Sequence, residues 1–95
     1  MLLDPTANVG KREDAALDLG ASDQPEAEHV LLRVARDPQT DPRLAETCGE
    51  ALGEIWCRKG KLNLEALQQV PESVRLSATA VIESQRPEWL AQIKK

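Results

Sequence analysis

Carboxylates form the most regular pattern of potentially reactive side chains in this sequence. Within the segment RLAETCGEALGEIW, residues 43–56, Glu46, Glu50 and Glu54 follow one another at intervals of four residues. On an α-helix this spacing places them on one side, as an acidic stripe. Three carboxylates along one open helix lack the enclosing ligands that calcium or magnesium requires, so we expect no metal site. The stripe is either a solvated helix face or a surface whose charge repulsion is relieved by a basic partner.

Histidine and cysteine provide no stronger candidate for chemistry. His29 is the single histidine and has no second ligand or nucleophile at a useful spacing. Cys48 and Cys57 lie about 180° apart around one predicted helix, too far to bridge, so we expect reduced thiols, as in the cytoplasm. Arg58 and Lys59 next to Cys57 favour a lowered pKa for its thiol. With no positioned acid, base or nucleophile, we expect no enzyme and no cofactor.

The acidic stripe belongs to an amphipathic helix, and the same periodicity predicts further helices. Opposite the carboxylates, an apolar side is formed by Leu44, Cys48, Ala51, Leu52 and Ile55. Capping and stop signals include Gly20, Asp41 before Pro42, Gly60 and Asn63. We expect helices from Thr6 or Lys11 to Leu19, from Pro25 to Arg36, from Pro42 to Arg58, from Leu64 to Val70, from Pro71 to Gln85, and a short last one from Pro87.

Composition predicts one all-α domain over residues 1–95. Apolar residues make up 41 % and charged residues 29 %, and the chain has no Phe, no Tyr and two Trp. A core of Leu, Val, Ile and Ala favours closely packed helices, because strands draw on β-branched and aromatic residues. The sequence has no apolar run of membrane-spanning length and no secretory pattern at its start. We therefore expect a cytoplasmic protein that does not bind membranes.

Charge is unevenly distributed along the chain. Twelve acidic and five basic residues precede Arg58, whereas four acidic and seven basic residues occur from Arg58 onward. An acidic face repels nucleic acid and attracts basic proteins, so we expect a basic protein partner and no nucleic acid. Glu13 and Asp37 could extend this acidic surface. The candidate partner-binding residues are Glu46, Glu50, Glu54, Asp14, Asp18, Asp41 and Trp56.

Two glycines lie beside the acidic stripe. Gly49 and Gly53 are one turn apart within the predicted helix, where each glycine costs about 1 kcal/mol relative to alanine. Such a pair indicates a close backbone approach. The neighbour is either another helix of this chain or a partner that occupies a flat groove, with Trp56 as an aromatic anchor.

A weak internal repeat connects these elements. The apolar pattern of residues 44–52 recurs 35 residues earlier and 30 residues later, which defines three helical hairpins. The recurring elements resemble HEAT repeats. They are Asp-Pro turns at 4–5 and 37–38, Ala-Leu pairs at 16–17 and 51–52, Gly53 followed by Ile55, and the second-helix segment 65–67. Glu13 departs from the pattern, because it stands where Cys48 and Ala78 lie in the other repeats. The resemblance implies a right-handed array of about three helical hairpins that binds proteins.

A small acidic array of this kind also resembles bacterial toxin immunity proteins, including those of contact-dependent growth inhibition systems. That resemblance implies a heterodimer in which the acidic helix face covers the basic active-site surface of a toxin, often a nuclease in such pairs. The alternative is a scaffold or adaptor that mediates protein–protein interaction as a HEAT-repeat protein.

Overall fold

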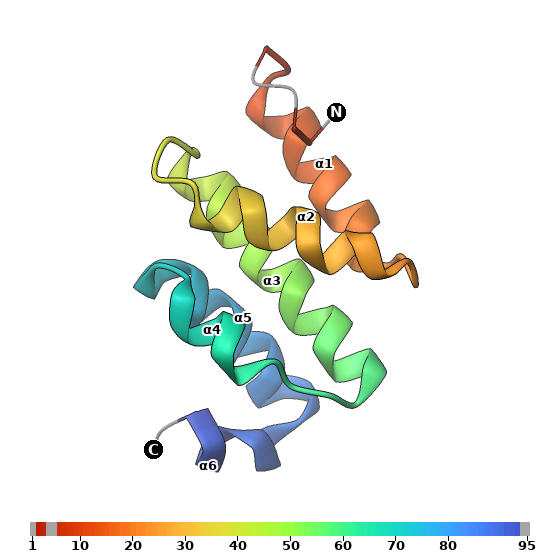
Figure 1. Cartoon of the computed structure of the whole chain (residues 1–95), viewed down its shortest axis with the longest axis vertical. Helices are drawn as coiled ribbons and strands as arrows, with labels where there is room; N and C mark the ends of the chain where they lie inside the picture. Colours follow the sequence, from red (N-terminus) through yellow and green to blue (C-terminus); the bar gives the residue numbers. More distant parts are fainter. Residues whose placement is uncertain (1, 4–5, 94–95) are drawn as a thin grey trace.

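The computed structural model describes residues 2–3 and 6–93, and every regular element within these ranges is helical (Figure 1). The all-α prediction is therefore confirmed. The Asp-Pro turn expected at residues 4–5 lies outside the described residues. The helices are α1 (Val9–Gly20), α2 (Pro25–Arg36), α3 (Pro42–Lys59), α4 (Leu64–Gln69), α5 (Glu72–Gln85), the 3-10 helix η1 (Pro87–Trp89) and α6 (Leu90–Ile93).

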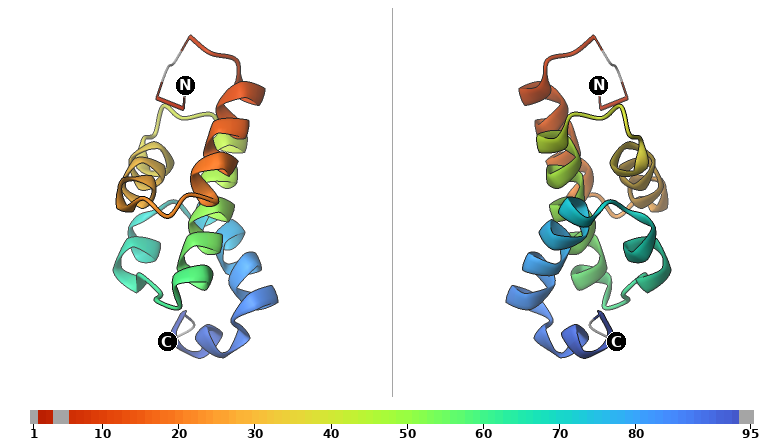
Figure 2. Two further views of the ribbon diagram at one scale, coloured as in Figure 1. Left: turned by 90° about the vertical axis from the view of Figure 1, so that its right-hand side faces the viewer. Right: turned by 90° about the vertical axis from the view of Figure 1, so that its left-hand side faces the viewer.

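The helices form two layers. Helices α1, α3 and α5 run in the same direction in one layer, whereas α2 and α4 lie together in the other (Figure 2). Helix α3 is central, because it packs against α1, α2 and α5. The described chain is elongated, with extents of 39 × 25 × 19 Å. This arrangement is compatible with the predicted succession of helical hairpins.

Predicted capping residues explain three of the helix boundaries. Asp41 accepts a hydrogen bond from the backbone N–H of Arg43 at 2.9 Å, directly before the proline that opens α3. Asn63 likewise accepts from the N–H of Ala66 at 3.1 Å and begins α4. Helix α3 ends at Gly60, whose φ of 69° lies in the left-handed region that favours glycine. These three signals were read correctly from the sequence.

The prediction that Gly20 caps α1 is wrong. Gly20 is the last helical residue, and Ala21 follows it as the capping residue. The importance of Gly20 is steric, because a Cβ atom built on it would lie 2.9 Å from the Cβ of Ala51 in α3. The missing side chain thus lets the end of α1 approach α3 closely.

The core is aliphatic, as the composition predicts. Leu31, Leu44, Leu52, Ile55 and Val74 are all at most 1 % exposed. They come from α2, α3 and α5, and Trp56 lies among them at 1 % exposed. In the described part of the chain, no helix combines the length and the apolar character needed to cross a membrane.

Gly49 and Gly53 bring α5 against α3. A Cβ atom at Gly49 would lie 2.6 Å from the carbonyl oxygen of Val74, and one at Gly53 would lie 3.0 Å from that of Ala78. The close neighbour anticipated from the sequence is therefore a helix of this chain. The glycines are covered by α5, so they do not form a flat groove for a partner.

Candidate functional site

The acidic stripe lies on the outer side of the layer formed by α1, α3 and α5. Glu46 and Glu50 are exposed and Glu54 is half-buried, whereas the opposite side of α3 is in the core. Among the described residues, none of these three carboxylates makes an ion pair or a hydrogen bond. The stripe therefore presents unpaired negative charge along two turns of the central helix.

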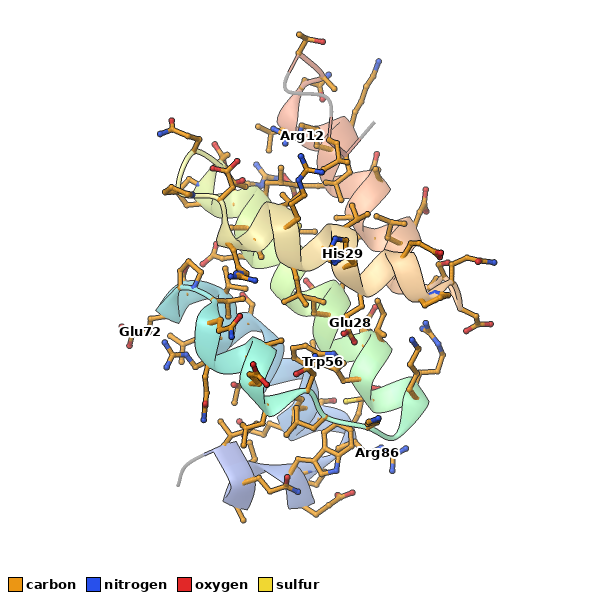
Figure 3. The ribbon with its side chains drawn as sticks, viewed as in Figure 1. Arg12, Glu28, His29, Trp56, Glu72 and Arg86 are labelled. Carbon is orange, nitrogen blue, oxygen red and sulfur yellow. The ribbon has the colours of Figure 1, made fainter. Side chains whose placement is uncertain are left out.

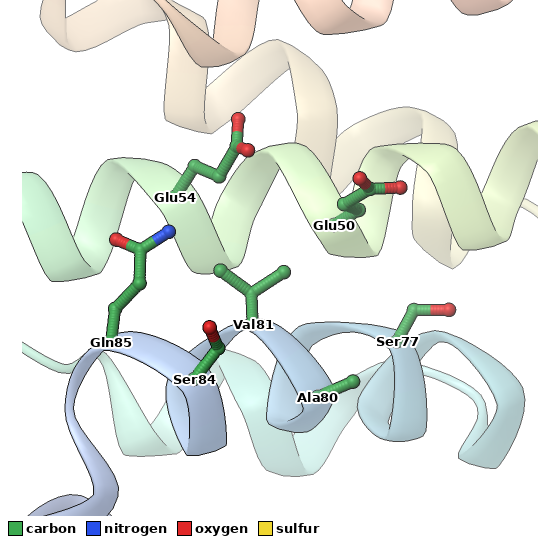
Figure 4. A pocket seen from close by; sticks show the side chains of 7 residues that line it. All are labelled: Glu50, Glu54, Ser77, Ala80, Val81, Ser84 and Gln85. Atoms are coloured by element: carbon green, nitrogen blue, oxygen red, sulfur yellow. The ribbon is translucent and has the colours of Figure 1, made fainter.

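A groove runs beside this stripe, between α3 and α5. Glu50 and Glu54 line its α3 side, and Val81 and Gln85 reach up from α5 on the other (Figure 4). Ser77, Ala80 and Ser84 complete the lining, and the groove volume is about 360 Å³. An aliphatic stem can rest on Val81 and Ala80 while a cationic head group reaches carboxylate, hydroxyl and amide oxygens. The groove is thus suited to lysine or arginine side chains.

The other predicted acidic residues do not join this groove. Asp18 lines a separate apolar groove with Leu2, Leu3, Ala15, Leu19 and Val30 at the α1–α2 end of the molecule. Asp14 is exposed on α1 four residues earlier, on the same side of that helix. Asp41 is occupied as the cap of α3. Within the predicted set, Glu46, Glu50 and Glu54 form the stripe on α3, and of these Glu50 and Glu54 line the groove.

Trp56 is not a surface anchor, which corrects the prediction that it contacts a partner. Its indole is buried, and Nε1 donates a hydrogen bond of 2.7 Å to Oε1 of Glu28 in α2. Asn63 donates to the other carboxylate oxygen of Glu28 at 3.3 Å. Glu28 and Trp56 lie together between α2 and α3 in Figure 3. The pair joins the two layers of the fold.

Glu28 has a structural importance that the sequence-based prediction missed. From the sequence, its position in the first turn of α2 indicates a favourable interaction with the helix dipole but does not indicate a contact with another helix. The available signal was Trp56 itself, because a buried indole N–H requires an acceptor. The sequence does not indicate which carboxylate provides it, since 28 residues separate the pair.

Polar contacts connect α1 and the following loop to α3. Arg58 donates to the carbonyl oxygens of Gly20 at 2.7 Å and Ser22 at 2.8 Å, and its Nε lies 3.4 Å from Asp23. At the other end, Glu13 pairs with Arg43 at 3.0 Å. Glu13 therefore belongs to a helix contact, although the sequence had suggested it as an extension of the acidic surface.

Both cysteines are free, as predicted, and both are buried. Burial raises the pKa of the Cys48 thiol to about 12, against a smaller lowering by Arg12. Burial likewise raises the pKa of the Cys57 thiol, and the positive charge of Arg86 lowers that pKa by a smaller amount. The expected lowering by Arg58 and Lys59 is therefore wrong, because desolvation of the thiolate outweighs the nearby positive charge.

The described residues contain no group of three His, Cys, Asp or Glu side chains that could hold a metal ion. What they offer is an exposed, unpaired acidic surface with an adjoining groove. No protein-family model, curated protein or solved structure matches the chain.

Proposed function

We propose that this protein is a non-catalytic, HEAT-like binding protein that neutralises a toxin by covering the toxin's basic active-site surface. The observation that carries the proposal is the unpaired stripe of Glu46, Glu50 and Glu54 beside the α3–α5 groove. Carboxylates spaced one helical turn apart repel one another, and a basic partner relieves that repulsion. The complex is a heterodimer of acidic immunity protein and basic toxin in the cytoplasm.

Burial of Trp56 changes the proposed contact but not its location. Without that indole, the hydrophobic part of the interface is provided by Ala80 and Val81 on the α5 side of the groove. Lysine or arginine side chains of the toxin lie over these residues and place their charges near Glu50 and Glu54. Electrostatic attraction then acts mainly on the association rate.

Charge reversal tests the proposal. The variant E46K/E50K/E54K is compared with E65K/E72K/E83K, which makes the same change in net charge at exposed positions outside the stripe. Binding partners are the basic proteins encoded beside this gene, and the readouts are toxin inhibition and the association rate measured at several salt concentrations. We expect the stripe variant to associate at least about tenfold more slowly and the control to change by less than about threefold.

Unchanged inhibition by the stripe variant would contradict the acidic-face mechanism.

A second candidate function, a scaffold or adaptor, is favoured by the apolar groove at the α1–α2 end. This groove is lined by Leu2, Leu3, Ala15, Leu19 and Val30. In a stacked array this end is where a further hairpin would pack. Binding of an adaptor partner at this groove should be lost in the Leu3→Glu variant and should not depend on salt concentration. These two results distinguish the adaptor function from the toxin-binding function.

A further inference from the structure

The face of the molecule opposite the acidic stripe carries a basic stripe. His29, Arg33 and Arg36 lie at intervals of four and three residues on α2, and all three are exposed. They line a groove of about 500 Å³ together with Leu32, Asp37 and Pro38. The buried side of α2 is formed by Ala27, Leu31, Val34 and Ala35, so the basic stripe points away from the core. The label of His29 in Figure 3 marks this outer side of α2.

The two arginines are unpaired within the described residues, since neither has an ion pair or a side-chain hydrogen bond there. The one acidic side chain of the groove, Asp37, accepts a hydrogen bond from the N–H of Gln39 at 2.8 Å. Because no described residue pairs with either guanidinium group, both can bind carboxylates in the two-pronged geometry that arginine favours.

The acidic and basic stripes are similar in length and opposite in sign, with three carboxylates on one and two arginines on the other. Residues 46–54 and 29–36 both cover about two helical turns, roughly 11–12 Å at 1.5 Å per residue. We propose that the basic stripe on α2 docks the acidic stripe on α3 of a second copy of this chain. Charge complementarity identifies the occupant, because Glu46, Glu50 and Glu54 provide three unpaired carboxylates over a similar length.

This contact joins copies head to tail. The stripes lie on opposite layers (Figure 2), so one two-fold axis cannot engage both at once. The contact is therefore heterologous and repeats from copy to copy, forming open chains of increasing length. If the proposed function is correct, a basic toxin competes for the acidic stripe and separates these chains into heterodimers.

Sedimentation velocity of the isolated protein tests the self-association without any toxin. A failure of the self-association proposal is therefore distinguishable from a failure of the proposed function. In 20 mM NaCl, we expect the weight-average mass of the wild type to rise with protein concentration. In 300 mM NaCl the apparent dissociation constant should increase at least about tenfold, because the contact is between exposed charges. The variants R33E/R36E and E46K/E50K should each remain monomeric, because their two stripes have the same sign.

Mixing the two variants provides the decisive measurement. One has two acidic stripes and the other two basic stripes, so an equimolar mixture should associate again to within about threefold of the wild type. The matched controls K59E/K61E and E65K/E83K should associate like the wild type. A monomeric wild type in low salt, or no recovery on mixing, would overturn the inference. Association that persists in high salt and is lost on Leu3→Glu would also overturn it, assigning the contact to the apolar groove.

Discussion

The central helix α3 is packed against its two layer neighbours in different ways. Toward α5, Gly49 and Gly53 let two backbones meet, and carbonyl oxygens and valine side chains of α5 lie against these glycines. Toward α1, one glycine, Gly20, gives close approach at the helix end. The other contacts there are polar: Arg58 donates to backbone carbonyls and Arg43 pairs with Glu13. The first contact is determined by side chains that are absent, so any addition must separate the helices. The second contact also includes polar interactions that can be removed singly, so the loss of each should be graded.

The largest effect is expected from Gly49→Ala. At an unhindered helical position this change stabilises by about 1 kcal/mol, but here the new Cβ would lie 2.6 Å from the Val74 carbonyl oxygen. We expect the free energy of unfolding, measured in urea, to fall by about 2–3 kcal/mol. Gly10→Ala is the control, because its Cβ would meet Asn8 at 3.4 Å, and it should stabilise slightly. Equal stability of both variants would show that the α3–α5 contact can relax.

Arg58→Ala should have the next largest effect, on the α1 side. The change removes hydrogen bonds to the carbonyl oxygens of Gly20 and Ser22. We expect a loss of about 1–2 kcal/mol in the free energy of unfolding, with Arg58→Lys in between because it retains charge without the guanidinium fork. Lys59→Ala, at the exposed neighbouring position, should change stability by less than about 0.5 kcal/mol. A loss as large for Lys59 would point to helix propensity as the cause.

The buried thiol of Cys48 predicts a loss of stability in alkaline solution. Its pKa rises from the ordinary cysteine value of 9.0 to about 12 in the folded protein, so above pH 9 the unfolded chain releases a proton that the folded chain retains. The free energy of unfolding should therefore fall by about 1 kcal/mol between pH 9 and pH 10. Cys48→Ala removes this contribution, and denaturation of both proteins across the range measures the difference. Parallel pH profiles would contradict the prediction.

The smallest effect is expected for Arg43→Ala. Arg43 pairs with Glu13, but its side chain is 78 % exposed, so water and salt screen the attraction. We expect a loss of about 0.5 kcal/mol or less in low salt, and less still in 1 M NaCl. Thermal melts at both salt concentrations provide the measurement. A loss above about 2 kcal/mol would mean that this ion pair, and not Arg58, dominates the contact with α1.

The sequence predicted the local features well. Asp41, Asn63 and Gly60 act through neighbours within a few residues, so capping and backbone preferences alone located the ends of α3 and the start of α4. The glycine pair also indicated a close contact, although not its partner. The period-3.6 pattern identified the buried side of α3, because burial on one helix face is the main signal in such patterns.

Features that depend on distant residues were not predictable. Trp56 lies at the edge of the apolar side in the sequence pattern, and only the packing of α2 places Glu28 against its indole. Cys57 has basic neighbours in sequence, but the fold buries its thiol, and the expected pKa direction reverses. Glu13 does not extend the acidic stripe because it pairs with Arg43, and Asp18 does not because it lines the apolar groove at the α1–α2 end.

The two tryptophans give this protein a pair of separate optical reporters. The chain contains no tyrosine or phenylalanine, so near-ultraviolet absorption and intrinsic fluorescence come from two indoles. One is buried between the layers and hydrogen-bonded to Glu28. The other, Trp89, lies with the Arg86 guanidinium 5.6 Å from its ring centre, and Arg86 also donates a hydrogen bond to the Cys57 carbonyl oxygen. Emission from Trp89 therefore follows attachment of the C-terminal helices, while emission from Trp56 follows assembly of the core.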